Sequence, residues 1–416
     1  MNGIAAWFMG FGMVLAGPGP DDLDTRVRAA LERARPVLLE HLQRSHGGQL
    51  ALLCLAALHD EVPKDHPVLA GGLARLLEAR LDGTYDHALR LMVMAEWSEC
   101  PGRERRARED LAELFARQVG GGFSYTNENP FWDLSNTQYG ALGMRAAASL
   151  GVRVDPERWQ RLLRAVRAEQ NQDGGFDYSR GRHGSYASMT VAGIGVLEIC
   201  RHHLGAQKVP ERLQREIDAA WAWMDRQAAS IGDPQALHCF YFHYGLERAA
   251  ILSGRKEVGG VDWYRRGAEM LLDLQAGGGG WSSGFGGRRG PNGPERGKGS
   301  PIDTAFAVLF LRRKFQAQAA PLTPGRATPV QGLAAQADER ALEAAIAHDV
   351  ARGLAAFPEL LECLRSPVVL RRKAAALAIA RISRRDFGYV PYIDPAQQEG
   401  AIRAAEAWWR AQAGGR

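Results

Sequence analysis

The sequence lacks most of the short motifs that mark a metal-binding or nucleotide-binding chain. Its 416 residues include five cysteines, and no two of them stand at the short spacing of a zinc knuckle or a redox pair. A His-Glu-x-x-His helix, a P-loop and a dinucleotide-binding phrase are all missing. The composition, 46% hydrophobic and 24% charged, is that of an ordinary globular protein. The fold must therefore be read from periodicity.

A clustered basic stripe is also missing. The formal net charge is +5, but the basic residues are spread along the chain and interleaved with acids. Recognition of nucleic acid needs basic side chains gathered on one face. We therefore expect no nucleic-acid partner.

The first residues form a short apolar segment. The run Ile4–Ala16 precedes Gly17 and Pro18, and it is too short to span a bilayer comfortably. Its small residues before the break resemble a secretory cleavage site, although no Lys or Arg precedes the run. We predict that residues 1–18 are a signal peptide and that the protein is exported, to the periplasm or the medium. The alternative is an interfacial helix or anchor on a cytoplasmic or membrane-associated protein.

Strand-like alternation is poor, and helical periodicity dominates residues 24–316. The pattern predicts six helical hairpins, each with an amphipathic first helix and a more apolar second helix. The predicted first helices are Thr25–Gln43, Pro67–Leu81, Arg103–Gln118, Pro156–Gln170, Pro210–Gln227 and Trp263–Gln275. The predicted second helices are Gln49–His59, Thr84–Trp97, Leu134–Gly151, Ser185–Leu204, Gln235–Gly254 and Asp303–Phe315.

Two of the turns between paired helices carry the same phrase. Gln275 is followed by Gly279 and Trp281, and Gln170 is followed by Gly174 and Phe176 at the same spacing. Glycine permits the positive φ that such a reversal needs. We expect the Gln amide to satisfy free carbonyls at the end of its own helix, while the aromatic ring packs on the Gln stem.

This phrase resembles the QW repeat of squalene-hopene and oxidosqualene cyclases. The stretch Arg266–Trp281 fits the repeat in full, and the whole hairpin region looks like the prenyltransferase/squalene-oxidase repeat superfamily. The resemblance implies an all-α (α/α)6 toroid whose inner helices surround a central cavity. Stacked hairpins would bury a continuous core in the same way.

After the hairpins, residues 317–337 read as a linker rich in Ala, Pro, Gly and Gln. Residues 338–416 form a tail with predicted helices at Arg340–Ala355, Glu359–Arg365 and Val369–Ile382. The last two resemble one HEAT-type repeat, which cannot stand alone and is expected to dock on the toroid. Trp408 and Trp409 are either packing anchors or a surface for a protein partner.

The strongest candidate for catalysis is Asp303. It lies in Ser300-Pro301-Ile302-Asp303-Thr304-Ala305, which is similar to the Asp-Thr-Ala ending of the cyclase acid motif. The resemblance places Ile302 at the proton-donating position and leaves Asp303 as the last acid. The alternative is a plain helix start, with Ser300 or Asp303 as the cap and Pro301 in the first turn.

A zinc site like that of protein prenyltransferases is the next candidate. His238 and Cys239 are neighbours on a helix, so at most one of them faces a cavity, and His243 does not share a face with His238. The inner helix at Tyr186 lacks the Asp-x-Cys of the transferases. We therefore predict no metal and no cofactor, and interpret this segment as polar and aromatic cavity lining.

The third candidate is the stretch 125–139, which is unusually polar and aromatic where it enters an apolar helix. Its side chains either brace the helix start or line a site at the cavity mouth, together with residues at equivalent places in other repeats. The predicted lining residues are Tyr85, Asp86, Trp132, Asp133, Asn136, Gln138, Tyr186, His238, Tyr241, Tyr244 and Thr304. The Arg-rich loop at 277–299 is either a surface insertion or a lid.

These observations predict a protein that binds a ligand without cyclising it. The resemblance suggests an apolar, isoprenoid ligand in or at the mouth of the cavity. Alternatives are a diverged cyclase or prenyltransferase-type enzyme that uses Asp303, and a lyase that acts on a glycan through Tyr, His and Arg. A third is a protein-interaction scaffold that binds a partner through the tail.

Overall fold

The computed structural model describes residues 20–97, 99–179, 184–205, 210–283, 298–313, 329–333, 339–383, 385, 387–391 and 393–413. The chain divides into two compact units, Met1–Ala320 and Pro321–Arg416. The predicted signal peptide at 1–18, most of the predicted linker and the arginines of the 277–299 loop lie outside the described residues. No helix in the described part is long and apolar enough to cross a membrane.

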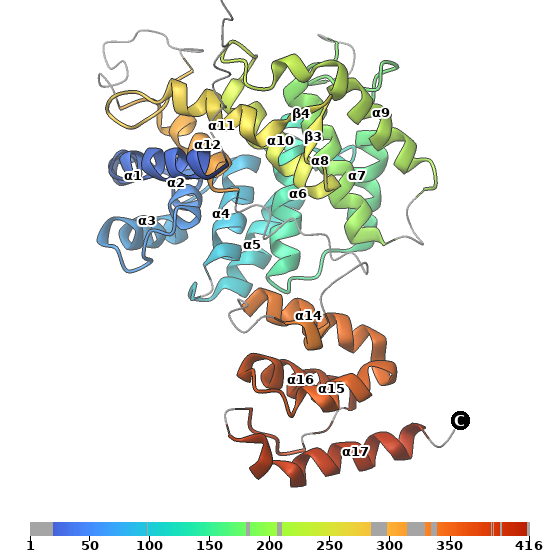
Figure 1. Ribbon diagram of the computed structural model, residues 1–416. Coiled ribbons are helices and arrows are strands. Elements are labelled where there is room, and N and C mark those ends of the chain that lie inside the picture. Colours follow the sequence, from blue (N-terminus) through green and yellow to red (C-terminus); the bar gives the residue numbers. More distant parts are fainter. Residues whose placement is uncertain are drawn as a thin grey trace, which may run out of the picture. The chain divides into compact units, whose positions relative to one another are not determined.

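The first unit is a closed ring of helices (Figure 1). Each inner helix contacts the next one along the chain, and α12 contacts α2, which closes the ring. The inner helices are α2 (Gly47–His59), α4 (Thr84–Glu96), α6 (Leu134–Ser149), α8 (Ala187–Leu204), α10 (Cys239–Ser253) and α12 (Pro301–Arg312). The all-α toroid of six hairpins predicted from the sequence is confirmed.

The outer helices cover this ring. They are α1 (Pro20–Arg44), α3 (Pro67–Glu78), α5 (Arg103–Ala116), α7 (Pro156–Ala168), α9 (Leu213–Arg226) and α11 (Trp263–Leu274). In α7 only one stripe is buried, as expected for an amphipathic helix on a surface. In α8 every residue from Ser188 to Cys200 is buried, because outer helices and neighbouring inner helices enclose it. The core therefore lies between the two layers.

Local signals fix several helix starts. Asp155 caps α7 ahead of Pro156, and Ser300 caps α12 by accepting a hydrogen bond from the Asp303 backbone N–H. The predicted start of α10 at Gln235 is wrong, because the helix begins at Cys239. His238 adopts a left-handed conformation (φ 55°) that a helix interior cannot contain. Short two-residue strands occur as the pairs β1 (Gln118–Val119) with β2 (Gly122–Phe123) and β3 (Glu257–Val258) with β4 (Val261–Asp262).

The repeated glutamines join neighbouring hairpins. Gln275 Nε2 donates to Gly279 O in its own turn and to Ala30 O in α1, both at 2.8 Å. Gln170 Nε2 does the same with Gly174 O and Glu216 O in α9. The expectation that the amide satisfies carbonyls at the end of its own helix is therefore wrong. It bonds the next outer helix, and Gln275 thereby links the last hairpin to the first.

The motif glycines allow that close approach. At Gly279 a Cβ atom would lie 2.3 Å from Arg33 O in α1, and at Gly174 it would lie 2.5 Å from Ala219 O in α9. Both residues also have positive φ, 94° and 91°. Each acceptor helix is thus touched twice, one turn apart, by the turn of the preceding hairpin.

The motif aromatic residues fix the following inner helix. The backbone N–H of Trp281 donates to Thr304 Oγ1 in α12, and Trp281 O accepts from the Ser300 N–H. Phe176 has the same two contacts with Thr190 and Tyr186 in α8. Phe123 repeats them with Thr137 and Asp133 in α6. We call this set of Gln, Gly, aromatic and Thr contacts the turn clamp.

The second unit is a small helical bundle. It contains α14 (Glu339–Arg352), α15 (Phe357–Cys363), α16 (Val369–Ser383) and α17 (Glu399–Ala413), with short 3-10 turns at η3 (Val330–Gly332), η4 (Gly353–Ala356) and η5 (Pro395–Gln397). Trp408 packs against Phe357 and Phe387, with ring centroids 5.2 and 6.2 Å apart. It therefore anchors α17, a helix that the sequence analysis did not predict.

Candidate functional site

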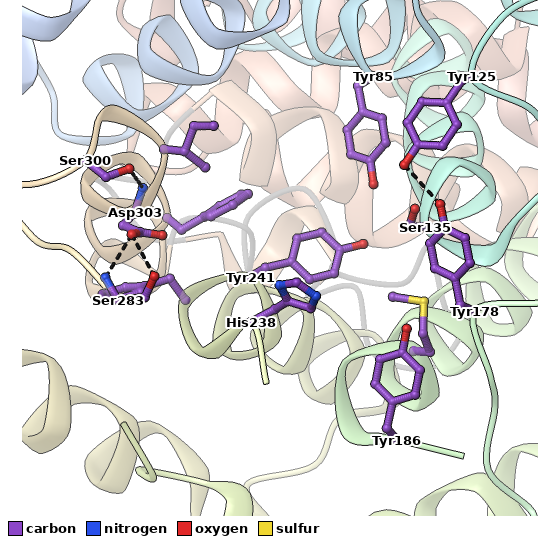
Figure 2. A pocket seen from close by; sticks show the side chains of 14 residues that line it. Tyr85, Tyr125, Ser135, Tyr178, Tyr186, His238, Tyr241, Ser283, Ser300 and Asp303 are labelled. Atoms are coloured by element: carbon purple, nitrogen blue, oxygen red, sulfur yellow. Dashed lines mark hydrogen bonds between the residues drawn. The ribbon is translucent and has the colours of Figure 1, made fainter. Parts of the chain in front are cut away.

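A pocket opens in the toroid where the inner helices begin. Its volume is about 410 Å³, and residues of five inner helices and of three turns surround it. Figure 2 shows Asp303 with Ser283 and Ser300 on one side, and Tyr85, Tyr125, Tyr178 and Ser135 on the other. The lining residues are Tyr85, Tyr125, Ser135, Tyr178, Tyr186, Met189, His238, Phe240, Tyr241, Ser283, Ser300, Ile302, Asp303 and Phe306.

The lining residues occupy repeated positions of the fold. Tyr186, His238 and Ser300 are the N-cap residues of α8, α10 and α12. Most of the other helical lining residues lie two or three positions further on, within the first turn. The loop residues Tyr125, Tyr178 and Ser283 each stand two positions after a turn-clamp aromatic. The turn clamp therefore positions the lining residues of three turns and of the helices α6, α8 and α12.

Hydroxyl groups gather on one side of the pocket. Tyr125 and Tyr178 share a hydrogen bond of 3.0 Å between their hydroxyls, and Ser135 Oγ donates to Asp133 Oδ1. Burial raises the pKa of Tyr85 well above its usual value, and it raises the pKa of Tyr186 to about 12. These phenols are therefore neutral at physiological pH and act as hydrogen-bond donors and acceptors.

Asp303 supplies the carboxylate of the pocket. Its Oδ2 accepts from the backbone N–H of Ser283 at 2.9 Å and from Ser283 Oγ at 3.1 Å (Figure 2). Among the described residues, none donates to its other oxygen, Oδ1. Burial raises the pKa of Asp303, and the two bonds from Ser283 oppose that rise. The carboxyl is thus held from one side and open on the other.

The neighbours His238 and Cys239 separate as a helix predicts. His238 lines the pocket, while Cys239 is buried behind it and contacts Met270. His243 accepts from the Gly232 N–H through Nε2 and donates through Nδ1 to Cys239 O, so both ring nitrogens are used. The described residues contain no cluster of His, Cys, Asp or Glu that could hold a metal ion.

The structure brings five of the predicted residues together at the pocket: Tyr85, Tyr186, His238, Tyr241 and Asp303. Asp133 instead caps α6, accepting from Ser135 Oγ and from the backbone N–H and side-chain amide of Asn136. Trp132 packs against Gly120 and Gly122 in the preceding turn.

The remaining predicted residues lie beside the pocket and are not among those that line it: Asp86, Gln138, Tyr244 and Thr304. Asp86 lies against Gly48 in the first turn of α2. Gln138 and Tyr244 are buried. Thr304 is fully buried and belongs to the turn clamp, which accounts for its hydroxyl without any ligand.

Sequence analysis missed several lining residues: Tyr125, Tyr178, Phe240, Ser283 and Phe306. The sequence did contain a signal for Tyr125, Tyr178 and Ser283, because each follows the aromatic residue of a turn clamp by two positions. Phe240 and Phe306 read as ordinary apolar positions of inner helices. Only the ring closure shows that they face the pocket.

Comparisons with known proteins give solved structures only. A variant of the type II terpene cyclase MstE from Scytonema, bound to geranylgeranyl dihydroxybenzoate, is 16% identical over 72% of this chain and 99% of that chain, with a TM-score of 0.48. A ligand-free variant of the same cyclase is 16% identical over 72% and 100%, with a TM-score of 0.47. A third, bound to merosterolic acid A, is 16% identical over 71% and 99%, with a TM-score of 0.46. No family model and no curated protein matches the chain.

Proposed function

We propose that the toroid binds a small, largely apolar molecule in this pocket without cyclising it. One observation carries the proposal: seven phenyl or phenol rings line a pocket of about 410 Å³, whose lining also includes three serines, one imidazole and one carboxyl. Apolar pockets with a few placed polar groups are typical of small-molecule sites. An isoprenoid is the ligand class that the sequence resemblance implies.

The arrangement would orient such a molecule. Phe240, Phe306 and Met189 offer apolar surface, while the hydroxyls of Tyr125 and Tyr178 lie at one side. A polar end of the ligand would be favoured there, because it could replace water with neutral phenol donors. The aromatic lining supports an apolar ligand better than a glycan.

Mass spectrometry of organic extracts from the purified full-length chain tests this proposal. We expect a stoichiometric lipid from the wild type and its loss from Ile302→Trp, which places a larger ring at the pocket rim. Ile302 is 45% exposed, so the change should be tolerated. The matched control is Leu237→Trp, at a residue that is 48% exposed and not among those that line the pocket. Equal lipid content in the two variants would contradict the proposal.

A second candidate function is acid catalysis by Asp303. The observation that favours it is a half-buried carboxyl with a raised pKa beside an aromatic pocket, with one oxygen that accepts no hydrogen bond from any described residue. Such an acid can protonate an alkene, and the rings would stabilise the cation that forms. Incubation of wild type and Asp303→Asn with linear polyprenyl substrates distinguishes the two functions. Cyclised products that vanish in the variant would replace the binding proposal.

Three further expectations remain proposals. Export through residues 1–18 is tested by fractionation of cells that express the full chain. Binding of a protein partner by the second unit, as a HEAT-like tail would do, is tested by cross-linking the full chain in its host. A chain without α17 is the comparison. A glycan ligand is tested by an oligosaccharide array.

A further inference from the structure

The pocket holds negative charge for which the described residues supply no matching cation. Asp303 lines it, and Asp133 caps α6, a helix that also contributes a lining residue. Neither carboxylate forms an ion pair with a Lys or Arg in the part of the chain that the structure describes. No described lining residue is Lys or Arg. Buried or half-buried charges are normally paired, because desolvation of a lone charge is costly.

The aromatic rings add to this negative field. Seven of the fourteen lining residues carry a phenyl or phenol ring. The face of such a ring is the negative side of its quadrupole, and it attracts a cation within about 6 Å of the centroid. Rings from separate helices and turns thus surround one small volume, and Asp303 Oδ1 at its side accepts no hydrogen bond from the residues that the structure describes.

The protein already places a cation of its own against the adjoining rings. The Arg248 guanidinium lies 3.9 Å from the Tyr244 ring centroid and 5.6 Å from that of Tyr139. Tyr139 in turn lies 4.3 Å from Tyr85, which lines the pocket. The rings of Tyr139 and Tyr244 therefore accept a planar cation. Arg248 itself is buried and does not line the pocket.

The helix starts around the pocket favour the opposite sign of charge. N-terminal ends of helices carry partial positive charge, worth about 0.3–1 kcal/mol for an anion at an exposed end. Asp133 at the N-cap of α6 and Asp303 in the first turn of α12 face that charge directly. An anionic ligand is therefore the main competitor, and the experiment includes it.

We propose that the natural ligand is an organic cation: a quaternary or protonated tertiary ammonium group held among the rings beside Asp303, joined to an apolar body. The inference rests on the proposed binding function and names its ligand class. The apolar body would occupy the part of the pocket near Phe240 and Met189. The ammonium group needs no hydrogen-bond donor from the protein, which suits a lining whose described residues include no Lys or Arg.

Calorimetry with three matched probes tests the inference on the full-length protein at low salt. The probes are 3-phenylpropyl-trimethylammonium, its neutral analogue with a tert-butyl group in place of the ammonium, and 4-phenylbutanoate. We expect the cation to bind about tenfold tighter than the neutral analogue, which corresponds to the usual strength of cation–π and carboxylate contacts. Tighter binding of the carboxylate probe would overturn the inference.

Variants assign the effect to the pocket. Asp303→Asn should weaken the cation about five- to tenfold and leave the neutral analogue unchanged. The matched control, Asp273→Asn, removes an exposed carboxylate from the outer helix α11 and should change neither affinity. Tyr125→Leu, at a residue that is 48% exposed, provides a second variant if Asp303→Asn folds poorly, and it should also weaken the cation.

The outcomes separate the two proposals. Equal binding of the cation and the neutral analogue, both lost in Ile302→Trp, would refute the charge inference and support the binding function. Binding of no probe, together with no lipid in the extracts, would count against both.

Discussion

The turn clamp and the pocket lining arise from the same three turns, yet they differ in how they use their residues. In the clamp, Phe123, Phe176 and Trp281 make the same pair of backbone contacts, and each pairs with a Thr in the following helix. Two positions later the residues are Tyr125, Tyr178 and Ser283, with side chains of two different kinds. The comparison shows that the repeated backbone contacts provide position, while the chemistry of the pocket comes from side chains outside the clamp.

The fifth hairpin tests this distinction, because its version of the clamp is different. There the Gly232 N–H donates to His243 Nε2, so an imidazole replaces the Thr hydroxyl. His238, the N-cap residue of the same helix α10, is the only lining residue among the described ones with a positive φ. We expect changes in the clamp to affect stability most and changes in the pocket lining to affect it least.

Loss of a clamp aromatic should have the largest effect. Trp281 is fully buried, and its Nε1 also donates to Leu271 O. We expect Trp281→Ala to reduce the free energy of unfolding by about 3–5 kcal/mol, because it leaves a cavity where the last hairpin of the toroid meets the first. Chemical denaturation followed by circular dichroism measures this. Trp281→Phe is the control, because Phe occupies the same place in the other two clamps, and it should retain most of the stability.

Acid should destabilise the fifth hairpin through His243. Burial lowers the pKa of His243 to about 4, whereas an unfolded His titrates near 6.5. The unfolded chain therefore binds more protons in this window, and His243 favours folding fully above pH 6.5. That contribution falls by about 1.4 kcal/mol per pH unit towards pH 4.

Nuclear magnetic resonance of the histidine ring and hydrogen exchange of the Gly232 amide follow this directly. We expect the ring to titrate near pH 4 and the amide to exchange faster as the pH falls. The Trp281 amide, held by Thr304, is the internal comparison and should change less. A ring that titrates near 6.5 would show that His243 is not buried as described.

Loss of one clamp hydroxyl should have an intermediate effect. Thr304→Val keeps the shape of the side chain but leaves the buried Trp281 N–H without its acceptor, which we expect to cost about 1–3 kcal/mol. Thr304→Ser restores the acceptor and should cost less. Denaturation midpoints of the two variants, and of Thr190→Val in α8, measure the difference. A Val variant as stable as the Ser variant would contradict the role of Thr304 in the clamp.

Changes in the lining should affect stability least. Tyr178→Phe removes the hydroxyl that bonds Tyr125, which is itself 48% exposed. We expect a loss of about 0.5 kcal/mol or less, because water can replace an exposed hydrogen bond. Ligand affinity should change more than stability. A destabilisation as large as that of Thr304→Val would show that the pocket lining also contributes to folding stability.

Much of the fold follows from local sequence. The helical period separates amphipathic outer helices from more apolar inner ones, and Asp155 with Pro156, or Ser300 with Pro301, marks a start by capping chemistry alone. The start of α10 was misplaced because the left-handed turn at His238 has no local sequence signal. The helix α17 was missed, and its position depends on the packing of Trp408 against Phe357.

The sequence by itself determined the hairpins, the Gln–Gly–aromatic turns and the presence of an acid at the start of the last inner helix, since these depend on neighbours within a few residues. Only the tertiary structure decided which side chains meet. Asp303 lines the pocket while the next residue, Thr304, is buried in the turn clamp, because adjacent helical positions face different directions. Tyr85 and Phe306 line one pocket because α12 packs on α2, and that closure depends on contacts between the two ends of the hairpin array.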